Sequence, residues 1–153
     1  RPVIGAANLR AEVTGEPAAA IELPDGEIIT GKTSELLGAS SALLLNALKK
    51  LAGLDDEVHL IAPTIIGPIQ ELKIKHLGNA NPRLHTAEVL IALSICATTD
   101  ERAKRAMEQL PNLKGLEVHS SVILSQVDKN VFRKLGTNLT CEPAYQTKKL
   151  YHK

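Results

Sequence analysis

Two β-prone runs of mainly apolar residues, separated by a polar turn signal, predict a β-hairpin near the start of the chain. Residues 18–23 form a β-prone run, Pro24-Asp25-Gly26 follows as a turn signal, and residues 27–30 resume the strand pattern. An Asp-Gly pair between two such runs favours the tight turn of a hairpin. The sequence therefore predicts that residues 27–30 are extended and pair with residues 18–23.

Three later segments also have strand patterns. Residues 57–62 alternate between apolar and polar side chains, and residues 116–124 do so over a longer run. Residues 138–141 form a third, shorter segment of the same kind. A period of two is typical of half-buried strands, so each segment is predicted to be a strand.

Helical periodicity fills the first intervals between these strands. Leu44, Leu48 and Leu51 form one apolar stripe, and Ser40 or Ser41 is the expected N-cap of a helix that runs to about residue 52. Residues 33–37 are a candidate separate helical turn before it. A second helix is expected to open at Pro63-Thr64, with Pro68 tolerated only in its first turn because proline lacks the N–H of a helix interior.

Three further helices are predicted in the second half of the chain. The helix over about residues 86–97 is apolar almost all round, which is typical of a helix covered on several sides. Thr98 and Glu101 are spaced as a capping box for an amphipathic helix that Pro111 ends. The last helix spans about residues 127–135 and ends at Gly136.

The order of these elements predicts an α/β fold. Strands that alternate with helices favour a sheet covered on both faces, here a three-layer α/β/α sandwich. The order resembles the cytidine-deaminase-like fold, in which a hairpin leads into alternating helices and strands, as an analogy of topology. We expect one domain over residues 1–153, cut from the C-terminal part of a longer protein, with a polar linker after Pro143.

Composition and charge narrow the classes of partner. Apolar residues make up 44% of the 153 residues, which supports an aliphatic core, whereas aromatic residues make up only 2%. A net charge of +1 gives no basic footprint for nucleic acid or a membrane surface. Cys96 and Cys141 lie in apolar stretches, as expected for thiols in a reducing compartment, so a cytoplasmic location is predicted.

The most conspicuous motif match is a P-loop-like string at residues 26–33, Gly-Glu-Ile-Ile-Thr-Gly-Lys-Thr. A true P-loop curls so that its backbone N–H groups face phosphates. Ile28, Ile29 and Thr30 are β-branched and favour an extended strand over that curl. The string is therefore predicted to be a strand followed by a turn.

Metal motifs are missing from the sequence. A zinc deaminase needs a His or Cys ligand, a Glu proton shuttle and a Pro-Cys-x-x-Cys motif, and the corresponding junction reads Ala62-Pro63-Thr64 without cysteines. His-Glu-x-x-His is also missing. The prediction is a fold without catalytic zinc, without another metal and without a recognisable cofactor.

Polar residues at element ends are the candidates for ligand binding. A pocket is expected beyond the C-terminal ends of the strands, where helix N-termini point at ligands. His85 and Glu88 are compatible with an acid–base or ligand pair, and equally with a helix cap. Asn8 and Arg10 follow an apolar run and would line a pocket or form a solvated strand end. The candidates are Asn8, Arg10, Lys32, Thr33, Ser34, Thr64, Arg83, His85, Glu88, His119 and Ser121.

Three strings carry a resemblance to a known family. They are RPVIGAANLRAE at residues 1–12, TGKTSELLG at 30–38 and HSSVILSQVD at 119–128. With them, essentially the whole chain resembles the C-terminal region of an uncharacterised bacterial protein family, domain of unknown function eighteen-forty-six. The resemblance implies a deaminase-like layered fold in a protein roughly three times as long. Some members carry the label ATP-dependent peptidase, and the family provides no established catalytic residues to carry over.

These observations favour a non-zinc ligand-binding or subunit-contact domain of a bacterial cytosolic protein. One alternative is an ATP- or phosphate-linked hydrolase that uses residues 26–33. Another is a pure oligomerisation module driven by the apolar helix over residues 86–97. The expected partners are the remaining domains of the same protein, a second copy, or a small anionic ligand.

Overall fold

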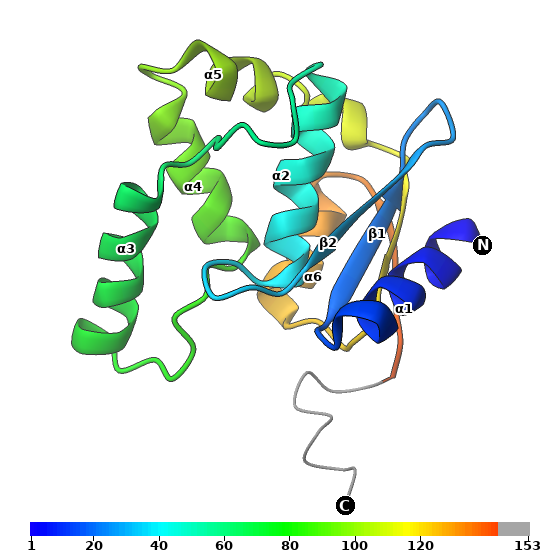
Figure 1. Ribbon diagram of the computed structural model, residues 1–153, viewed down its shortest axis with the longest axis horizontal. Helices are drawn as coiled ribbons and strands as arrows, with labels where there is room; N and C mark the ends of the chain where they lie inside the picture. Colours follow the sequence, from blue (N-terminus) through cyan, green and yellow to red (C-terminus); the bar gives the residue numbers. More distant parts are fainter. Residues whose placement is uncertain (144–153) are drawn as a thin grey trace, which may run out of the picture.

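A four-stranded mixed sheet organises the chain, with strand order β2-β1-β3-β4. The computed structural model describes residues 1–143 (Figure 1). Strand β1 (Ala18–Glu22) pairs antiparallel with β2 (Ile28–Lys32) and with β3 (Glu117–Ser120), and β3 pairs parallel with β4 (Asn138–Cys141). Strands β2, β3 and β4 therefore run in one direction, and their C-terminal ends lie at the same edge of the sheet.

Helices cover both faces of this sheet. In the described part of the chain they are α1 (Pro2–Thr14), α2 (Ala39–Leu51), α3 (Pro63–Glu71), α4 (Thr86–Cys96), α5 (Glu101–Met107) and α6 (Gln126–Lys134), with a π-helical segment η1 (Leu72–His76) and a 3-10 segment η2 (Leu110–Leu113). Figure 1 shows α1 on one side of the sheet and α2 and α6 on the other. None of the described helices has the length and apolar character needed to cross a bilayer.

The main core lies between the sheet and α2, α4 and α6. Ile21 and Val118 face it from the sheet, and Phe132 of α6 is fully buried in it. Strand β2 and helix α2 approach each other closely at Gly31, because a Cβ atom there would lie only 2.7 Å from the Cα of Leu43 in α2. On the other face, Ala20 packs against α1. Small residues on both sides of β1 and β2 thus let helices approach the sheet closely.

The predicted hairpin is confirmed. Strands β1 and β2 pair antiparallel from Ala18↔Lys32 to Glu22↔Ile28. Gly26 has φ +89°, a left-handed value that glycine adopts without strain. The coarse α/β expectation and the short strand at residues 138–141 are confirmed as well.

The N-terminal segment is a helix, so the strand end considered as one of two alternatives for Asn8 and Arg10 is not found. Residues 2–14 form α1, with Pro2 in the first turn and Gly15 as the left-handed C-cap at φ +73°. Asn8 and Arg10 therefore lie on a helix and not at a strand end. Only Val3 and Ala7 of this helix are buried, a spacing of four residues that one helix face accommodates and a strand does not.

Two predicted strands are also corrected. Residues 57–62 form turns, bends and irregular structure and pair with no strand of the described sheet. The strand expected over residues 116–124 ends at Ser120, whose Oγ donates to the carbonyl of Val122 at 2.7 Å and turns the chain. The linker predicted after Pro143 lies outside the described residues.

Several helix starts differ from prediction. Gly38, and not Ser40 or Ser41, is the N-cap of α2, and the Ser41 hydroxyl instead donates to Leu84 O at 2.9 Å. Asp100 replaces the predicted Thr98 as the cap of α5. Residues 33–37 form no helical turn. Pro68 lies in the second turn of α3 and not in the first. In each case the hydrogen bonds available nearby select the cap, and sequence spacing alone does not reveal them.

Candidate functional site

The N-termini of α2 and α4 lie side by side at the C-terminal edge of the sheet. The short segments before them form a parallel bridge between Leu37 and Leu84. Gly38 N donates to Leu84 O at 3.2 Å, and Leu84 N donates to Leu36 O at 3.0 Å. Two positive helix ends are thus placed next to each other, an arrangement that favours negative charge nearby.

Four of the predicted site residues meet here. The Arg83 guanidinium donates through Nε to Ser34 O at 2.5 Å, which ties the start of α4 to the chain after β2. Glu88 Oε1 accepts from His85 N at 2.8 Å and also from Lys73 Nζ at 2.8 Å. Glu88 therefore caps α4. Of the two interpretations of the His85 and Glu88 pair, this contact is the helix cap.

Asp128 at the start of α6 supplies a second negative charge to the same place. Its Oδ1 accepts from the backbone N and the hydroxyl of Thr86, at 3.1 and 2.6 Å. Its Oδ2 lies 3.8 Å from His85 Nδ1, which is too long for a hydrogen bond. Burial is the largest influence and raises the pKa of this carboxyl, but the neighbouring His85 and the Thr86 hydrogen bonds outweigh it and lower the pKa below its ordinary value.

This cluster is largely neutralised by its own members. Its charged and polar groups compensate one another and the two positive helix ends, so little charge remains to recognise a ligand. These groups belong to Lys73, Glu88, His85 and Asp128. Two buried hydroxyls, those of Thr33 and Ser40, have no hydrogen-bond partner among the described residues. The cluster therefore has a mainly structural role, because it holds α2, α4 and α6 in fixed positions relative to one another.

Residues 26–33 do not form a phosphate-binding loop. They contain all of β2, and Gly31 is packed against α2 with no room for a bound group on that side. The N–H groups of a strand pair with the neighbouring strand and do not converge on one point. Lys32 is half-buried at the end of β2. The P-loop match is therefore a coincidence of spacing.

His119 and Ser121 have structural partners within the sheet. His119 is 2% exposed, with Nδ1 2.7 Å from Thr140 Oγ1 and Nε2 2.8 Å from Glu142 Oε2. Ser121 Oγ accepts from Ala18 N at 2.9 Å. The His119 ring and the Ser121 hydroxyl are thus used in contacts that join β1, β3 and the end of β4.

The remaining predicted residues are scattered. Asn8 and Arg10 lie on α1, on the opposite face of the sheet from α2 and α4. Thr64 is exposed in the first turn of α3. No described contact joins them to the cluster at the helix starts. The described residues also contain no group of three or more His, Cys, Asp or Glu side chains that could hold a metal ion.

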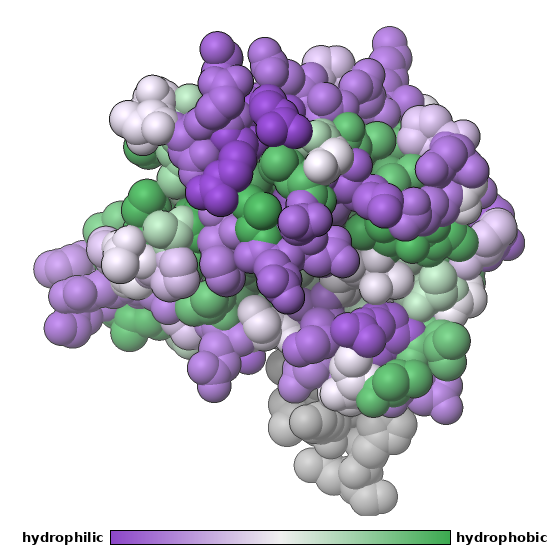
Figure 2. Space-filling model, turned by 45° about the horizontal axis from the view of Figure 1, so that its top comes forward, coloured by the Kyte–Doolittle hydropathy of each residue, from purple (hydrophilic) through white to green (hydrophobic). Residues whose placement is uncertain are grey.

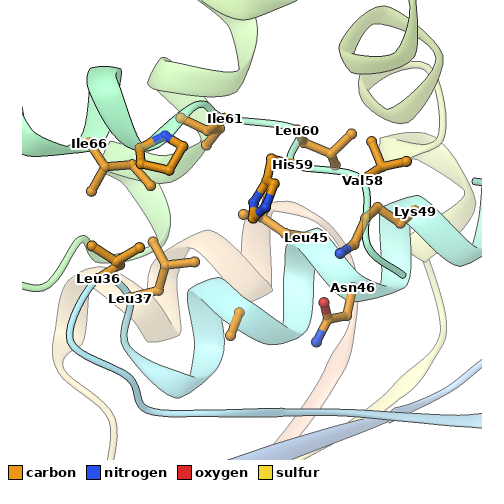
Figure 3. A pocket seen from close by; sticks show the side chains of 12 residues that line it. Leu36, Leu37, Leu45, Asn46, Lys49, Val58, His59, Leu60, Ile61 and Ile66 are labelled. Atoms are coloured by element: carbon orange, nitrogen blue, oxygen red, sulfur yellow. The ribbon is translucent and has the colours of Figure 1, made fainter. Parts of the chain in front are cut away.

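A cavity that the sequence did not indicate lies along α2. It has a volume of about 140 Å³ and opens between α2 and the segment over residues 58–63. Figure 3 shows the side chains of Asn46, Lys49 and His59 among apolar neighbours such as Leu45 and Leu60. The polar residues come from α2 and from a segment predicted to be a strand, and only the tertiary structure brings them together.

The helix that the sequence marks as apolar almost all round, α4, has an exposed apolar face. Ile91 and Ile95 are 62% and 60% exposed, although α4 carries no charged residue after Glu88. The two hydroxyls on this face bond back to the helix, Ser94 Oγ to Ile91 O and Thr98 Oγ1 to Ile95 O, each at 2.6 Å. Figure 2 shows apolar patches among polar side chains at left, over the α3 and α4 side of the molecule.

Together, these features define a mixed α/β domain without an evident catalytic centre among the described residues. Residues 1–151 match the family described as "Domain of unknown function DUF1846, C-terminal". The chain belongs to this family.

Curated bacterial relatives are similar over the whole chain. UPF0371 protein cu0538 of Corynebacterium urealyticum is 60% identical over 153 residues, which is 100% of this chain and 31% of that protein. UPF0371 protein SpyM50764 of Streptococcus pyogenes is 57% identical with the same coverage. The chain therefore spans about a third of the length of these relatives.

Proposed function

We propose that this chain is a contact domain, whose exposed α4 face packs against the part of the longer relatives that it does not span. The single observation that carries the proposal is the pair of exposed isoleucines, Ile91 and Ile95, on a helix face without charge. They are four residues apart and therefore form one stripe. Such a stripe on a solvated helix is unusual, since exposed helix faces normally carry charged side chains.

The hydrogen bonds on this face support the same proposal. Ser94 and Thr98 turn their hydroxyl groups back to the helix carbonyls and present mainly carbon atoms outward. A face with its polar groups satisfied internally loses little when it leaves water. The longer relatives contain a segment that can cover this face, because about two thirds of each lies outside the matched segment.

The test is to mix this chain with the unmatched two thirds of the Corynebacterium urealyticum relative and to measure their association by sedimentation. We expect a one-to-one complex that Ile91→Glu weakens roughly a hundredfold, since the contact would bury a carboxylate. Thr99→Glu adds the same charge just beyond α4 and is expected to leave the complex intact.

Two results would contradict this assignment. One is the absence of association while both parts are folded by circular dichroism. The other is a dimer of this chain alone that Ile91→Glu splits into folded monomers, which would identify a second copy as the occupant. A mutant that stays folded is expected in each case, because Ile91 is already exposed.

Three further expectations from the sequence concern the type of fold, the cellular location and the peptidase label. The deaminase-like arrangement is supported by the hairpin and by helices on both faces of the sheet. A cytoplasmic location is supported by two free thiols, Cys96 and Cys141, the first of them buried. The ATP-dependent peptidase label finds no support in residues 26–33, which belong to the hairpin.

A further inference from the structure

Two buried lysines differ in their partners. Lys73 is 3% exposed, and its ammonium forms a salt bridge with Glu88 at 2.8 Å. Lys49 is 9% exposed, and its ammonium donates to the backbone carbonyl of Asp56 at 2.6 Å. No carboxylate of the described residues lies within salt-bridge distance of Lys49. Buried charges are normally paired, and Lys49 has only the more distant carboxylate of Asp56 as a counter-charge.

The cavity along α2 lies at this ammonium group. Lys49 and Asn46 line it from α2, and Figure 3 shows the Lys49 side chain extending toward the His59 ring on the opposite side. Asn46 donates through Nδ2 to Thr30 O at 3.0 Å, which leaves its carbonyl oxygen available as an acceptor. The polar groups are thus gathered at one end of the cavity.

The rest of the cavity is apolar. Leu37, Leu45, Leu60 and Ile66 contribute to its wall. A cavity of about 150 Å³ holds a molecule the size of benzene, so the volume of about 140 Å³ suits roughly six to eight non-hydrogen atoms. An apolar wall with convergent polar groups at one end matches a small amphipathic molecule.

The charge state of Lys49 agrees with this geometry. Burial lowers the pKa of its ammonium group, and the charge of Asp56 offsets only part of that effect. A ligand anion at the ammonium would favour its charged form and fill the missing contact.

We propose that this cavity binds a short aliphatic carboxylate, with the carboxylate as the counter-ion of Lys49 and the hydrocarbon against the wall formed by Leu45, Leu60 and Ile66. This binding site is independent of the contact face on α4, because the two lie on different helices. The chemistry recognised is one negative charge joined to a compact apolar group.

The experiment titrates the protein with sodium hexanoate and, separately, with 1-hexanol, and follows binding by NMR chemical shifts. Hexanoate is expected to bind roughly tenfold or more tightly than hexanol and to shift the resonances of α2. Equal binding of the two, or no binding of hexanoate, overturns the proposal. This comparison uses the unaltered protein and does not depend on any variant.

Three variants separate ligand binding from a structural role of Lys49. Lys49→Met is expected to remove the preference for hexanoate over hexanol. Ala42→Phe fills the cavity from α2, keeps the charge and is expected to abolish binding of both. Lys50→Met removes a charge from the exposed neighbour that pairs with Glu27, and is expected to leave binding unchanged. Preserved hexanoate preference in folded Lys49→Met or Ala42→Phe would overturn the assignment.

Discussion

Asp128 Oδ1 accepts hydrogen bonds from both the backbone N–H and the hydroxyl of Thr86, so the first turn of α6 caps the first turn of α4. The two residues are 42 positions apart in the chain. A single carboxylate thereby joins the last helix to the middle of the molecule. Because the Asp128 side chain is buried, this contact stabilises the fold to an extent that depends on whether the carboxyl group is ionised.

The Asp128 carboxylate is expected to stabilise the fold in a pH-dependent manner. Because its pKa is lowered in the folded state, its contribution is fully present above the unfolded pKa of about 4 and is lost as the pH falls through the folded pKa. Asp128→Asn should reduce the free energy of unfolding by about 2 kcal/mol at neutral pH, since it replaces charge-assisted hydrogen bonds. Urea unfolding at several pH values measures this effect.

The pH profile provides the control for that variant. As the pH falls through the lowered pKa of folded Asp128, the difference between the variant and the unaltered protein should shrink, because the protonated carboxyl is then neutral like the amide of the variant. A difference that stays constant from pH 7 to acid would mean that shape, and not ionisation, explains the loss.

Gly31→Ala is expected to destabilise the protein by about 3 kcal/mol, because the added methyl group meets backbone atoms that cannot rotate away. The new Cβ would lie 2.7 Å from Leu43 Cα and 2.9 Å from Ala39 O. Gly5→Ala is the matched control, since nothing lies within 4 Å of a Cβ there and alanine favours the helix. Thermal unfolding of both variants tests the prediction, and a neutral Gly31→Ala would contradict the close packing of α2 on β2.

Local signals in the sequence were sufficient to predict part of the fold. The hairpin follows from Asp25-Gly26 and its β-branched flanks, and the cap at Glu88 follows from its spacing to His85. The alternation over residues 57–62 predicts a strand, yet no neighbouring strand is present to pair with it. Pairing partners are a property of the whole sheet, so alternation alone cannot establish a strand.

The candidate cavity could not be predicted in the same way. Lys49 occupies the last turn of α2, where a basic residue has an ordinary role at the negative helix end. Only the folded chain shows that its ammonium is buried and that His59 lies across the cavity. The cluster around Arg83 and His85 was predictable as a meeting point, but its internal neutralisation depends on Asp128, which sequence reasoning did not select.

Thr140→Val is expected to lower stability by about 2 kcal/mol, because it leaves Nδ1 of the buried His119 without its partner. Thr140→Ser keeps the hydroxyl and is expected to cost less than half as much. Unfolding in urea compares the two. A loss in Thr140→Ser as large as that in Thr140→Val would show that the hydrogen bond to His119 does not dominate the contribution of Thr140.

The ion pair between Lys73 and Glu88 gives the last prediction. Glu88→Gln keeps an oxygen that can accept from His85 N and from Lys73 Nζ, but it removes the negative charge that compensates the buried Lys73 ammonium. Removal of one partner from a buried pair costs about 3 kcal/mol. Lys73→Met should cost less, since the Glu88 side chain is 34% exposed and water can solvate its charge.

The double variant Lys73→Met with Glu88→Gln is therefore expected to be more stable than Glu88→Gln alone, because it removes the unpaired buried charge. A double-mutant cycle by urea unfolding measures this coupling, and additive losses would show that the pair does not interact. Glu88→Gln also places Lys73 in the position that Lys49 already occupies, a buried ammonium bonded to a backbone carbonyl. The measured loss thus sets the scale of stabilisation that an anion bound beside Lys49 can provide.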